Sequence, residues 1–324
     1  ALFSELPNPG VLRAEIRRLF GWLKQQELTT VITAERDRPD KLTRHGIEEF
    51  VSDCVIVLDN RIREEISTRR LRIVKYRGST HGTNEYPFLI DAQGISVLPL
   101  SSLGLDHAAP SARISTGIDR LDGMLGGTGF YRGSSILISG TSGTGKTSVA
   151  AHFVEAACRR GERCVYFAFE ESPRQVARNM RSIGIDLEPW IRQGLLQFHA
   201  ARPTYGGIEE ILLVTHQHIA SFRPTVVVVD PITSLLMVST PGEVRSMLTR
   251  LVDFLKTHAV TAIFTSLTAP GGALEASEAD ISSLMDTWLL LRAIEVGGER
   301  NRALYVLKSR GMDHSNQIRE FVLT

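Results

Sequence analysis

The chain has 324 residues, 43% of them hydrophobic, and its 37 lysines and arginines against 36 aspartates and glutamates leave a net charge of +1. This length allows more than one folded domain, and the even charge argues against a protein whose whole surface attracts nucleic acid or anionic lipid. Three irregularly spaced cysteines, Cys54, Cys158 and Cys164, fit neither a disulfide framework nor a zinc site, and because no apolar run reaches the roughly 20 residues that cross a bilayer, we expect a cytoplasmic protein.

The first predicted elements belong to a segment that occurs twice. Lys75–His81 reads K-Y-R-G-S-T-H, and Lys308–His314, 233 residues later, reads K-S-R-G-M-D-H. At the same spacing, the apolar strand Val55–Leu58 corresponds to Trp288–Leu291. Further matches at spacings of 233 or 232 residues are Asp53 with Asp286, Phe88 with Phe321, Leu23–Lys24 with Leu255–Lys256, and Val31–Thr33 with Ile263–Thr265. Agreement over about forty positions exceeds what shared strand patterning produces, so we interpret the chain as two copies of one fold.

The repeat predicts the domain organisation. A counterpart of Lys146, the lysine of the phosphate-binding loop described next, would precede residue 1 in the first copy. We therefore expect residues 1–104 to be the back half of a first domain, residues 105–111 to be a short linker, and residues 112–324 to be a complete second domain. On this interpretation the chain is a piece of a longer tandem protein.

The second copy contains a glycine-rich loop between a strand and a helix. The apolar run Ser134–Ser139 predicts the strand, Ser148–Cys158 spaces its apolar residues as a helix does, and Gly140–Thr147 fits G-x-x-x-x-G-K-[ST]. Glycines let backbone N–H groups turn around phosphate oxygens, and the helix directs its positive end at the anion. We expect ATP to be bound by Lys146 on the outer phosphates, by Thr147 through Mg²⁺, and by the neighbouring loop residues Gly140, Thr141, Ser142, Gly143, Thr144, Gly145 and Ser148.

Two further predicted strands end in acidic residues. Thr225–Val229 precedes Asp230, and Cys164–Phe169 precedes Glu170 and Glu171. Because the carboxyl ends of parallel strands line the crevice where nucleotides bind, we expect Asp230 to position Mg²⁺, directly or through water. Successive strand residues face opposite sides, so we assign Glu170 as the catalytic base and Glu171 as its partner and a further magnesium ligand. The alternatives are an aspartate that only caps the next turn and a solvated pair of glutamates.

These residues resemble one known family. Arg113–Asp122, the phosphate-binding loop, Glu170–Glu171 and Lys308–Gly311 are similar to the carboxy-terminal domain of KaiC, a family of circadian-clock ATPases and autokinases, and Thr43–Asp53 is similar to the end of its first domain. The resemblance implies an α/β, RecA-like P-loop fold with a mostly parallel central sheet flanked by helices, preceded here by a partial copy. It also implies a double-ringed homohexamer that holds nucleotide between subunits.

The resemblance further implies phosphate transfer to side chains of the protein itself, and removal of that phosphate. The family's acceptors are an adjacent serine and threonine, and the matching residues are Ser282 and Ser283, so the second acceptor is changed. Lys308 and Arg310, two apart on a predicted strand, are expected to reach a neighbour's γ-phosphate. Arg302 is expected, by resemblance alone, to contact the base or ribose.

The end of the chain limits the clock interpretation. It stops at Phe321–Thr324, close to where the last core strand should end, whereas family members that keep time carry a further tail that binds the regulator KaiA. We therefore expect a KaiC-like autokinase, with clock-type or signalling proteins as regulators, rather than a clock oscillator.

Two other functions stay open. A recombinase of the RecA or RadA type shares the P-loop core, but residues 259–291 contain no lysine or arginine, and their acidic residues Glu275, Glu278, Asp280 and Asp286 disfavour single-stranded DNA. A nucleotide-switched scaffold would hydrolyse ATP without keeping phosphate on a side chain.

Overall fold

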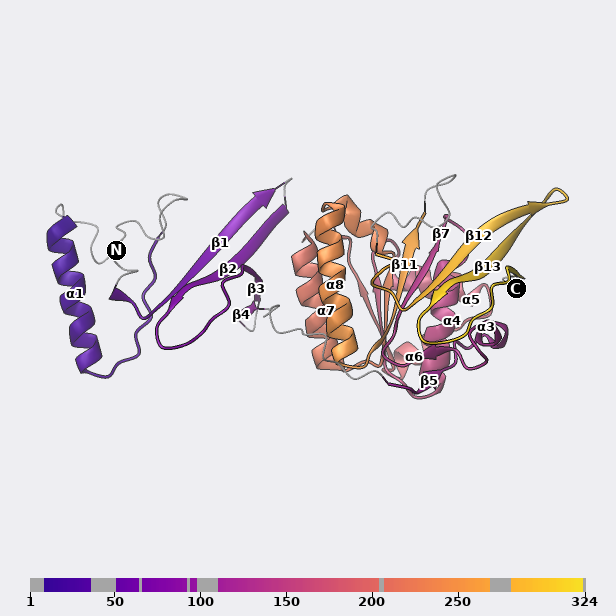
Figure 1. The fold of residues 1–324 in the computed structure, drawn as a ribbon, viewed down its shortest axis with the longest axis horizontal. Helices are drawn as coiled ribbons and strands as arrows, with labels where there is room; N and C mark the ends of the chain where they lie inside the picture. Colours follow the sequence, from indigo (N-terminus) through magenta and orange to yellow (C-terminus); the bar gives the residue numbers. More distant parts are fainter. Residues whose placement is uncertain are drawn as a thin grey trace. The chain divides into compact units, whose positions relative to one another are not determined.

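The computed structural model describes residues 9–35, 51–63, 66–91, 94–97, 110–203, 207–268 and 281–322. The chain forms two compact units, one of Ala1–Arg61 and Arg69–Ser101 and the other of Ile62–Thr68 and Ser102–Thr324, and each is described by itself (Figure 1). Most of the expected linker, residues 43–50 and the acidic residues Glu275, Glu278 and Asp280 lie outside the described residues. Among the described helices, none combines the length and apolarity needed to cross a membrane.

The second unit is built on one large sheet. Its strands are β7 (Ser135–Gly140), β8 (Cys164–Ala168), β9 (Leu196–Ala200), β10 (Val226–Asp230), β11 (Thr261–Leu267), β12 (Thr287–Val296), β13 (Glu299–Ser309) and β14 (Arg319–Phe321). Their spatial order is β14-β13-β12-β7-β11-β10-β8-β9. All neighbours from β12 to β9 pair in parallel, and β13 and β14 continue the sheet in antiparallel. The predicted α/β, RecA-like fold with a mostly parallel central sheet is confirmed.

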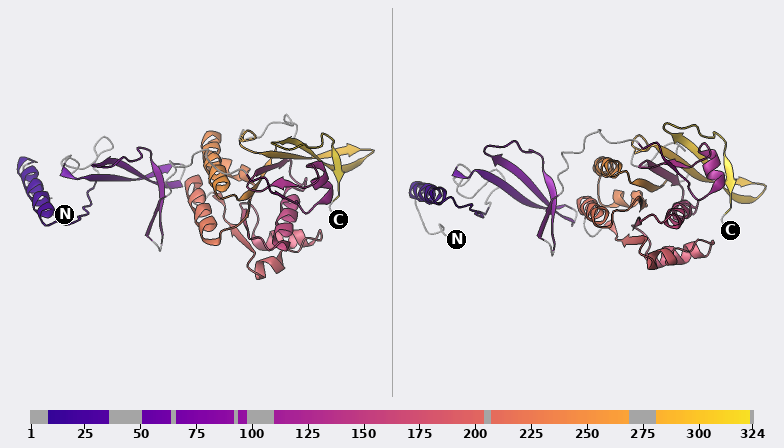
Figure 2. Two further views of the ribbon diagram at one scale, coloured as in Figure 1. Left: turned by 60° about the horizontal axis from the view of Figure 1, so that its bottom comes forward. Right: turned by 90° about the horizontal axis from the view of Figure 1, so that it is seen from below.

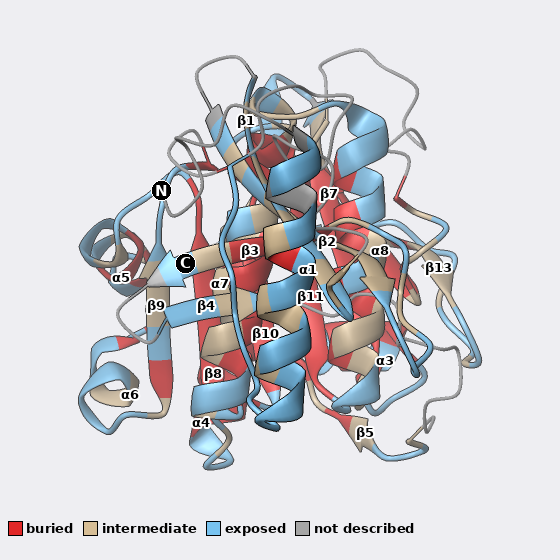
Figure 3. Cartoon of the chain, turned by 90° about the vertical axis from the view of Figure 1, so that its left-hand side faces the viewer, coloured by how far each residue is buried: buried red, intermediate tan, exposed pale blue. Residues whose placement is uncertain are grey.

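Helices cover both faces of this sheet. Figures 1 and 2 show α4 (Lys146–Arg159) on one face, and α7 (Gly207–Phe222) and α8 (Pro241–Thr257) together on the other. The central strands are therefore buried on both faces, and the four valines of β10 are at most 3% exposed. Figure 3 shows the buried residues concentrated in central strands such as β7, β8 and β11.

Shorter elements complete the second unit. A two-stranded sheet pairs β5 (Arg113–Ile114) with β6 (Phe130–Tyr131). The remaining helices are α3 (Asp119–Met124), α5 (Pro173–Arg181), α6 (Glu188–Arg192) and the 3₁₀ helix η2 (Ile232–Met237). Both α5 and α8 begin with a capping box followed by a proline, and this combination fixes where the two helices start.

The first unit repeats elements of the second one. It contains α1 (Pro9–Gln25) and a sheet in the order β1-β2-β3-β4, made of β1 (Cys54–Arg63), β2 (Ile66–Tyr76), β3 (Tyr86–Asp91) and β4 (Gly94–Val97). At spacings of 232 and 233 residues, α1 coincides with α8, β1 with β12 and β2 with β13, at both ends of each element. The sequence repeat therefore extends to the bounds of these three pairs of elements, while the assignment of the two domains and their boundaries at residues 104 and 112 stays a prediction.

The two copies differ where the sheet would be completed. Ile263–Thr265 lies in β11, between β7 and β10, but the matching Val31–Thr33 forms no strand, and Val31 is 89% exposed. A strand needs hydrogen-bonding neighbours, and the described part of the first unit provides none at this place. Sequence similarity matches Val31–Thr33 with a segment of β11, but pairing partners decide whether such a segment becomes a strand.

Candidate nucleotide site

The glycine-rich loop connects β7 to α4 at the carboxyl end of the parallel strands. A Cβ on Gly140 would lie 2.3 Å from the Leu291 carbonyl oxygen on β12, so this position requires glycine. Gly143 and Gly145 have φ of 78° and 97°, the left-handed region that glycine enters without strain, and Gly145 is the N-cap of α4. Gly145 offers no side chain to cap α4, and the first N–H groups of that helix are available to an anion.

Lys146 is enclosed by the loop itself. Its Nζ donates to the carbonyl oxygens of Gly140 and Thr141, at 2.9 Å in each case, and the residue is only 7% exposed. Burial lowers the pKa of Lys146, and the negative charges of Asp230 and Glu170 oppose that shift. The ammonium group is therefore hydrogen-bonded to two backbone carbonyl groups and interacts electrostatically with Asp230 and Glu170.

Asp230 receives hydrogen bonds from three hydroxyl groups. Thr147 Oγ1 donates to its Oδ2 at 2.9 Å, Tyr166 Oη donates to the same oxygen, and Thr265 Oγ1 donates to Oδ1. The three donors come from α4, β8 and β11, so the carboxylate is held by elements on both sides of β10. Thr147 and Asp230 together present hydroxyl and carboxylate oxygens, the hard ligands that Mg²⁺ prefers.

The two glutamates follow β8 on the same edge of the sheet. Ala168 pairs with Asp230 across β8 and β10, which places the next residues beside the aspartate. Ser234 Oγ donates to Glu170 Oε1 at 2.9 Å, and the amide of Asn179 donates to Glu171 Oε2 at 3.4 Å. Both glutamates are exposed, and they are oriented by different neighbours.

The remaining loop residues are linked within the loop or to β13. Thr144 Oγ1 donates to the Thr141 carbonyl at 2.8 Å, and Arg302 Nε donates to the Gly143 carbonyl at 3.2 Å. Arg302 therefore lies beside the loop of its own chain. The structure brings together the loop, Asp230, Glu170 and Arg302 at one edge of the sheet. Within the described residues, no group of three or more histidine, cysteine and acidic side chains could hold a metal alone.

Ser282 and Ser283 lie at the other end of the strands. They precede β12, whose Thr287 pairs with Ile136 near the start of β7, whereas Leu291 pairs with Gly140 at the phosphate-binding end. Strand residues rise about 3.3 Å each, so roughly 13 Å of strand separates the two ends. Ser282 is half-buried and Ser283 is exposed.

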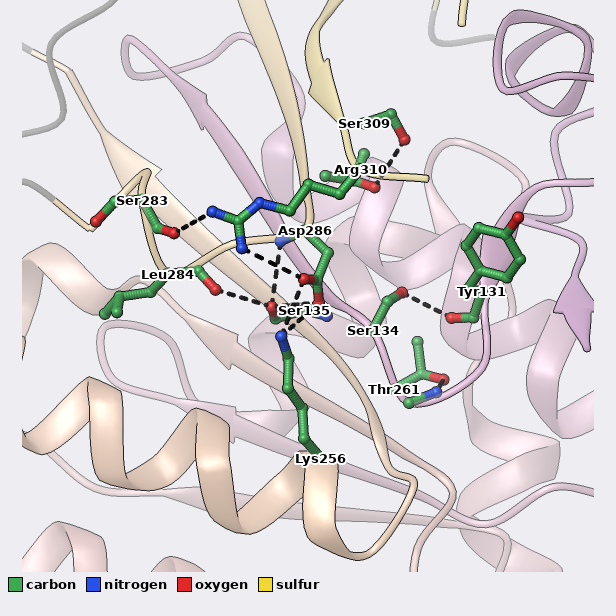
Figure 4. A network of polar contacts seen from close by, with 12 residues as sticks. Tyr131, Ser134, Ser135, Lys256, Thr261, Ser283, Leu284, Asp286, Ser309 and Arg310 are labelled. Atoms are coloured by element: carbon green, nitrogen blue, oxygen red, sulfur yellow. Dashed lines mark hydrogen bonds and ion pairs between the residues drawn. The ribbon is translucent and has the colours of Figure 1, made fainter. Parts of the chain in front are cut away.

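A network around Asp286 fixes this second end (Figure 4). Asp286 Oδ2 accepts from the N–H and hydroxyl of Ser135, both at 2.9 Å, and Lys256 Nζ donates to Oδ1 at 2.9 Å. Burial works to raise the pKa of Asp286, but the Ser135 and Lys256 hydrogen bonds outweigh it and hold the pKa below its usual value. Asp286 therefore fixes the segment after the serines to the start of β7.

The predicted cationic residues contact the serine segment. Lys308 Nζ donates to the Ser282 carbonyl at 2.9 Å, and Arg310 Nη2 donates to the Ser283 carbonyl at 2.7 Å. β13 ends at Ser309, so Arg310 is one residue beyond the strand on which the sequence placed it, because its N–H turns to the Asp286 carbonyl. Both cations nevertheless lie at the serine end, away from the loop of their own chain.

Sequence reasoning missed the residues that orient the acids. Tyr166, Thr265 and Ser234 contact Asp230 or Glu170, yet none of them belongs to a motif. Tyr166 interrupts an apolar strand with one hydroxyl, which is the only hint that its sequence context offers.

Comparison with known proteins shows which family shares these features. The family model described as "ATPase: KaiC" matches residues 1–102 and 114–324. The chain is 54% identical over 327 residues to "Circadian clock protein KaiC2" of Synechocystis sp., covering 100% of this chain and 57% of that protein. It is 40% identical to "Circadian clock oscillator protein KaiC" of Parathermosynechococcus lividus, covering 100% of this chain and 60% of that protein.

A second protein of the same Synechocystis strain, "Circadian clock oscillator protein KaiC 1", is 39% identical over 326 residues, covering 100% of this chain and 63% of the relative. The chain is thus more similar to one of the two Synechocystis proteins than to the other. It spans less than two thirds of the length of each of these three relatives.

Proposed function

The chain belongs to the KaiC ATPase family, and from this premise we propose that it binds ATP with Mg²⁺ and transfers the terminal phosphate to Ser282 or Ser283 of a neighbouring subunit. The proposal is supported by the separation of two half-sites on one sheet, the loop at Gly140–Ser148 and the serine segment at the opposite end. Hydrolysis of ATP, which the family name indicates, is the same chemistry with water as the acceptor.

The loop fits the phosphates of ATP. Its glycine positions leave the first N–H groups of α4 free for an anion, and the Lys146 ammonium now bonded to two carbonyls can turn to the outer phosphates instead. Thr147 and Asp230 would hold Mg²⁺, with Glu171 as a further ligand. When bound, Mg²⁺ neutralises charge on the phosphate oxygens. Arg302, which contacts the loop, is assigned to the base or ribose.

Glu170 is the proposed base. It is exposed at the end of β8, it interacts electrostatically with Lys146, and Ser234 fixes one of its oxygens at 2.9 Å. The other oxygen is available to accept the proton of a water or of an acceptor hydroxyl. Glu171, oriented by Asn179, is its partner.

The acceptor of the phosphate belongs to another subunit. Reacting atoms must approach to about 3–3.5 Å, whereas roughly 13 Å of β7 alone separates the loop of one chain from the edge that carries its own serines. A ring in which the loop edge of one subunit faces the serine edge of the next removes this separation. We therefore propose the homohexameric ring of the KaiC family for the full-length protein.

Lys308 and Arg310 are the proposed neighbour-facing cations. They hold the backbone of Ser282 and Ser283, so they accompany the acceptors to the neighbour's γ-phosphate. Burial lowers the pKa of Lys308, with a smaller contribution from the Arg310 charge, and a phosphate would counter both effects. Clock-type or signalling proteins are the proposed regulators.

Mass spectrometry after incubation with Mg²⁺ and ATP tests the proposal. We expect phosphate on Ser282 or Ser283, and a Ser282→Ala, Ser283→Ala double variant that still hydrolyses ATP but acquires none there. ATP hydrolysis with no phosphoserine would favour the nucleotide-switched scaffold. Stimulation of hydrolysis by single-stranded DNA would favour the recombinase.

A further inference from the structure

Tyr166 carries a buried hydroxyl that the proposed reaction has not yet used. The residue lies in β8 and is 0% exposed, and its ring packs on Phe198 with the ring centres 5.0 Å apart. A buried tyrosine hydroxyl needs a hydrogen-bond partner, and the partner here is Asp230 Oδ2. Packing therefore fixes the tyrosine ring, and its hydroxyl donates a hydrogen bond to Asp230, the proposed magnesium ligand.

The hydrogen bonds to Asp230 leave its two oxygens unequal. An ionised carboxylate oxygen has about two acceptor positions. On Oδ2 these are taken by Thr147 and Tyr166, while Oδ1 accepts from Thr265. Among the described residues, the acceptor position that remains is therefore on Oδ1.

We propose that Tyr166 is a positioning residue for the magnesium site, which fixes the Asp230 carboxylate so that Thr147 and Oδ1 face the cation together. The Thr147 hydroxyl donates its hydrogen bond to Oδ2, so the lone pairs of Oγ1 stay available for a metal ion. Tyr166 occupies the other position on Oδ2 and so opposes rotation of the carboxylate. This inference rests on the proposed function, because it concerns the same nucleotide site.

Magnesium should depend on this arrangement more than calcium does. Mg²⁺ requires nearly ideal octahedral geometry, whereas Ca²⁺ accepts more ligands at variable distances. Replacing a residue that hydrogen-bonds to a metal ligand typically weakens metal affinity by about 10- to 100-fold. A carboxylate that can rotate would thus weaken Mg²⁺ more than Ca²⁺, a difference that a purely structural tyrosine would not produce.

The test measures binding of a fluorescent, non-hydrolysable ATP analogue to the whole chain in EDTA, in Mg²⁺ and in Ca²⁺. For Tyr166→Phe we expect unchanged affinity in EDTA, about tenfold weaker binding in Mg²⁺ and a smaller loss in Ca²⁺. Phe198→Leu is the matched control, because it alters the packing of the same ring without removing a hydroxyl from Asp230. It should change all three affinities equally or not at all.

Thr265→Val provides an independent measurement, since it removes the hydroxyl on Oδ1 and should also weaken binding selectively in Mg²⁺. The inference is overturned if Tyr166→Phe binds as the wild type does in Mg²⁺, or loses the same factor in all three conditions. A wild-type chain that binds no analogue in any condition would overturn the proposed function as well, and the EDTA measurement distinguishes these failures.

Discussion

The two ends of β7 are built for opposite purposes. At the carboxyl end, glycines, the start of α4 and Lys146 form a loop whose donors can turn to an anion. At the amino end, Asp286, Ser135 and Lys256 form a closed network in which charges and N–H groups already satisfy one another. One end is open to a ligand, and the other positions a segment of the chain itself.

This difference explains why a single subunit is an incomplete enzyme in our account. The loop end supplies the groups that bind and activate a phosphate, and the network end supplies the hydroxyls that could receive it. Because the length of β7 separates the two groups within one chain, we propose that assembly of subunits brings donor and acceptor together. Variants at one end should therefore leave the other end intact.

The largest effect is expected at the loop end. Lys146→Ala removes the ammonium that reaches the outer phosphates, and each charged hydrogen bond contributes about 1.5–3 kcal/mol, so ATP affinity should fall by about 100-fold. Lys308→Ala is the matched control, because its Nζ also donates to a backbone carbonyl at 2.9 Å but lies at the network end. It should lower ATP affinity much less than Lys146→Ala does, because only a contact with the neighbour's γ-phosphate would be lost, and it should lose phosphorylation. Equal loss of ATP affinity in both variants would break the comparison.

The second-largest effect is expected on stability, and the internal repeat provides a matched ion pair as its control. Lys256 and Asp286 lie 2.9 Å apart with side chains 18% and 20% exposed, while the matching Lys24 and Asp53 lie 2.9 Å apart but are 55% and 53% exposed. Asp286→Ala leaves the half-buried Lys256 charge and the buried Ser135 N–H without this partner, which should cost about 2.5 kcal/mol of unfolding free energy. Asp53→Ala should be hard to distinguish from the wild type, because solvent screens that pair.

Urea or thermal unfolding measures both variants. ATP binding by Asp286→Ala below its unfolding transition should match the wild type, since the loop lies at the other end of β7. Similar destabilisation by the two substitutions would show that the difference in burial between the two ion pairs does not determine their contributions to stability.

The smallest effect arises away from both ends, between α7 and α8. His216 is 8% exposed and stacks on Phe254 with ring centres 3.6 Å apart, and its Nε2 has no hydrogen-bond partner in the described part of the chain. Burial, with a smaller contribution from the His258 charge, lowers the pKa of His216 to about 4 from the model-compound value of 6.5. Below pH 6.5 the unfolded chain therefore binds the proton more readily, and stability falls as the pH drops from 6.5 to 4.

Unfolding at pH 7.5 and pH 5 should show this loss as about 2 kcal/mol. His216→Phe keeps a ring against Phe254 but cannot titrate, so it should reduce the pH dependence of the unfolding free energy. Burial also lowers the pKa of His199 and His218, which leaves part of the dependence in the variant. An unchanged pH dependence in His216→Phe would contradict the assignment.

The sequence predicted the fold from patterns that packing enforces. Continuous runs of β-branched residues such as Val226–Val229 are typical of strands buried on both faces, and the glycine-rich loop motif is expected between a strand and a helix. The repeat was inferred from matching residues such as those around Lys75 and Lys308, and the bounds of the corresponding elements coincide in both copies. The lack of a strand at Val31–Thr33 has a physical reason, because strand formation depends on neighbours that the segment itself does not encode.

The site could be predicted only as far as motifs extend. Lys146, Thr147, Asp230 and Glu170 could be proposed as site residues because strand ends and the loop mark them. Tyr166, Thr265 and Ser234 were not, since single hydroxyls in strands and helices are common and only three-dimensional register reveals their targets. The contacts of Lys308 and Arg310 with the serine segment likewise depend on the antiparallel pairing of β12 and β13.

The most direct test of transfer between subunits mixes two variants, neither of which is expected to acquire phosphate on Ser282 or Ser283 by itself. Lys146→Ala lacks the donor end but keeps Ser282 and Ser283, and the Ser282→Ala, Ser283→Ala double variant lacks the acceptors but keeps the loop; isotopic labelling of one variant identifies each chain by mass. The account predicts that, with Mg²⁺ and ATP, phosphate accumulates on the serines of Lys146→Ala chains only after mixing. A second mixture combines Lys146→Ala with wild-type protein. Phosphate that appears there only on the serines of the wild-type chains would contradict transfer between subunits.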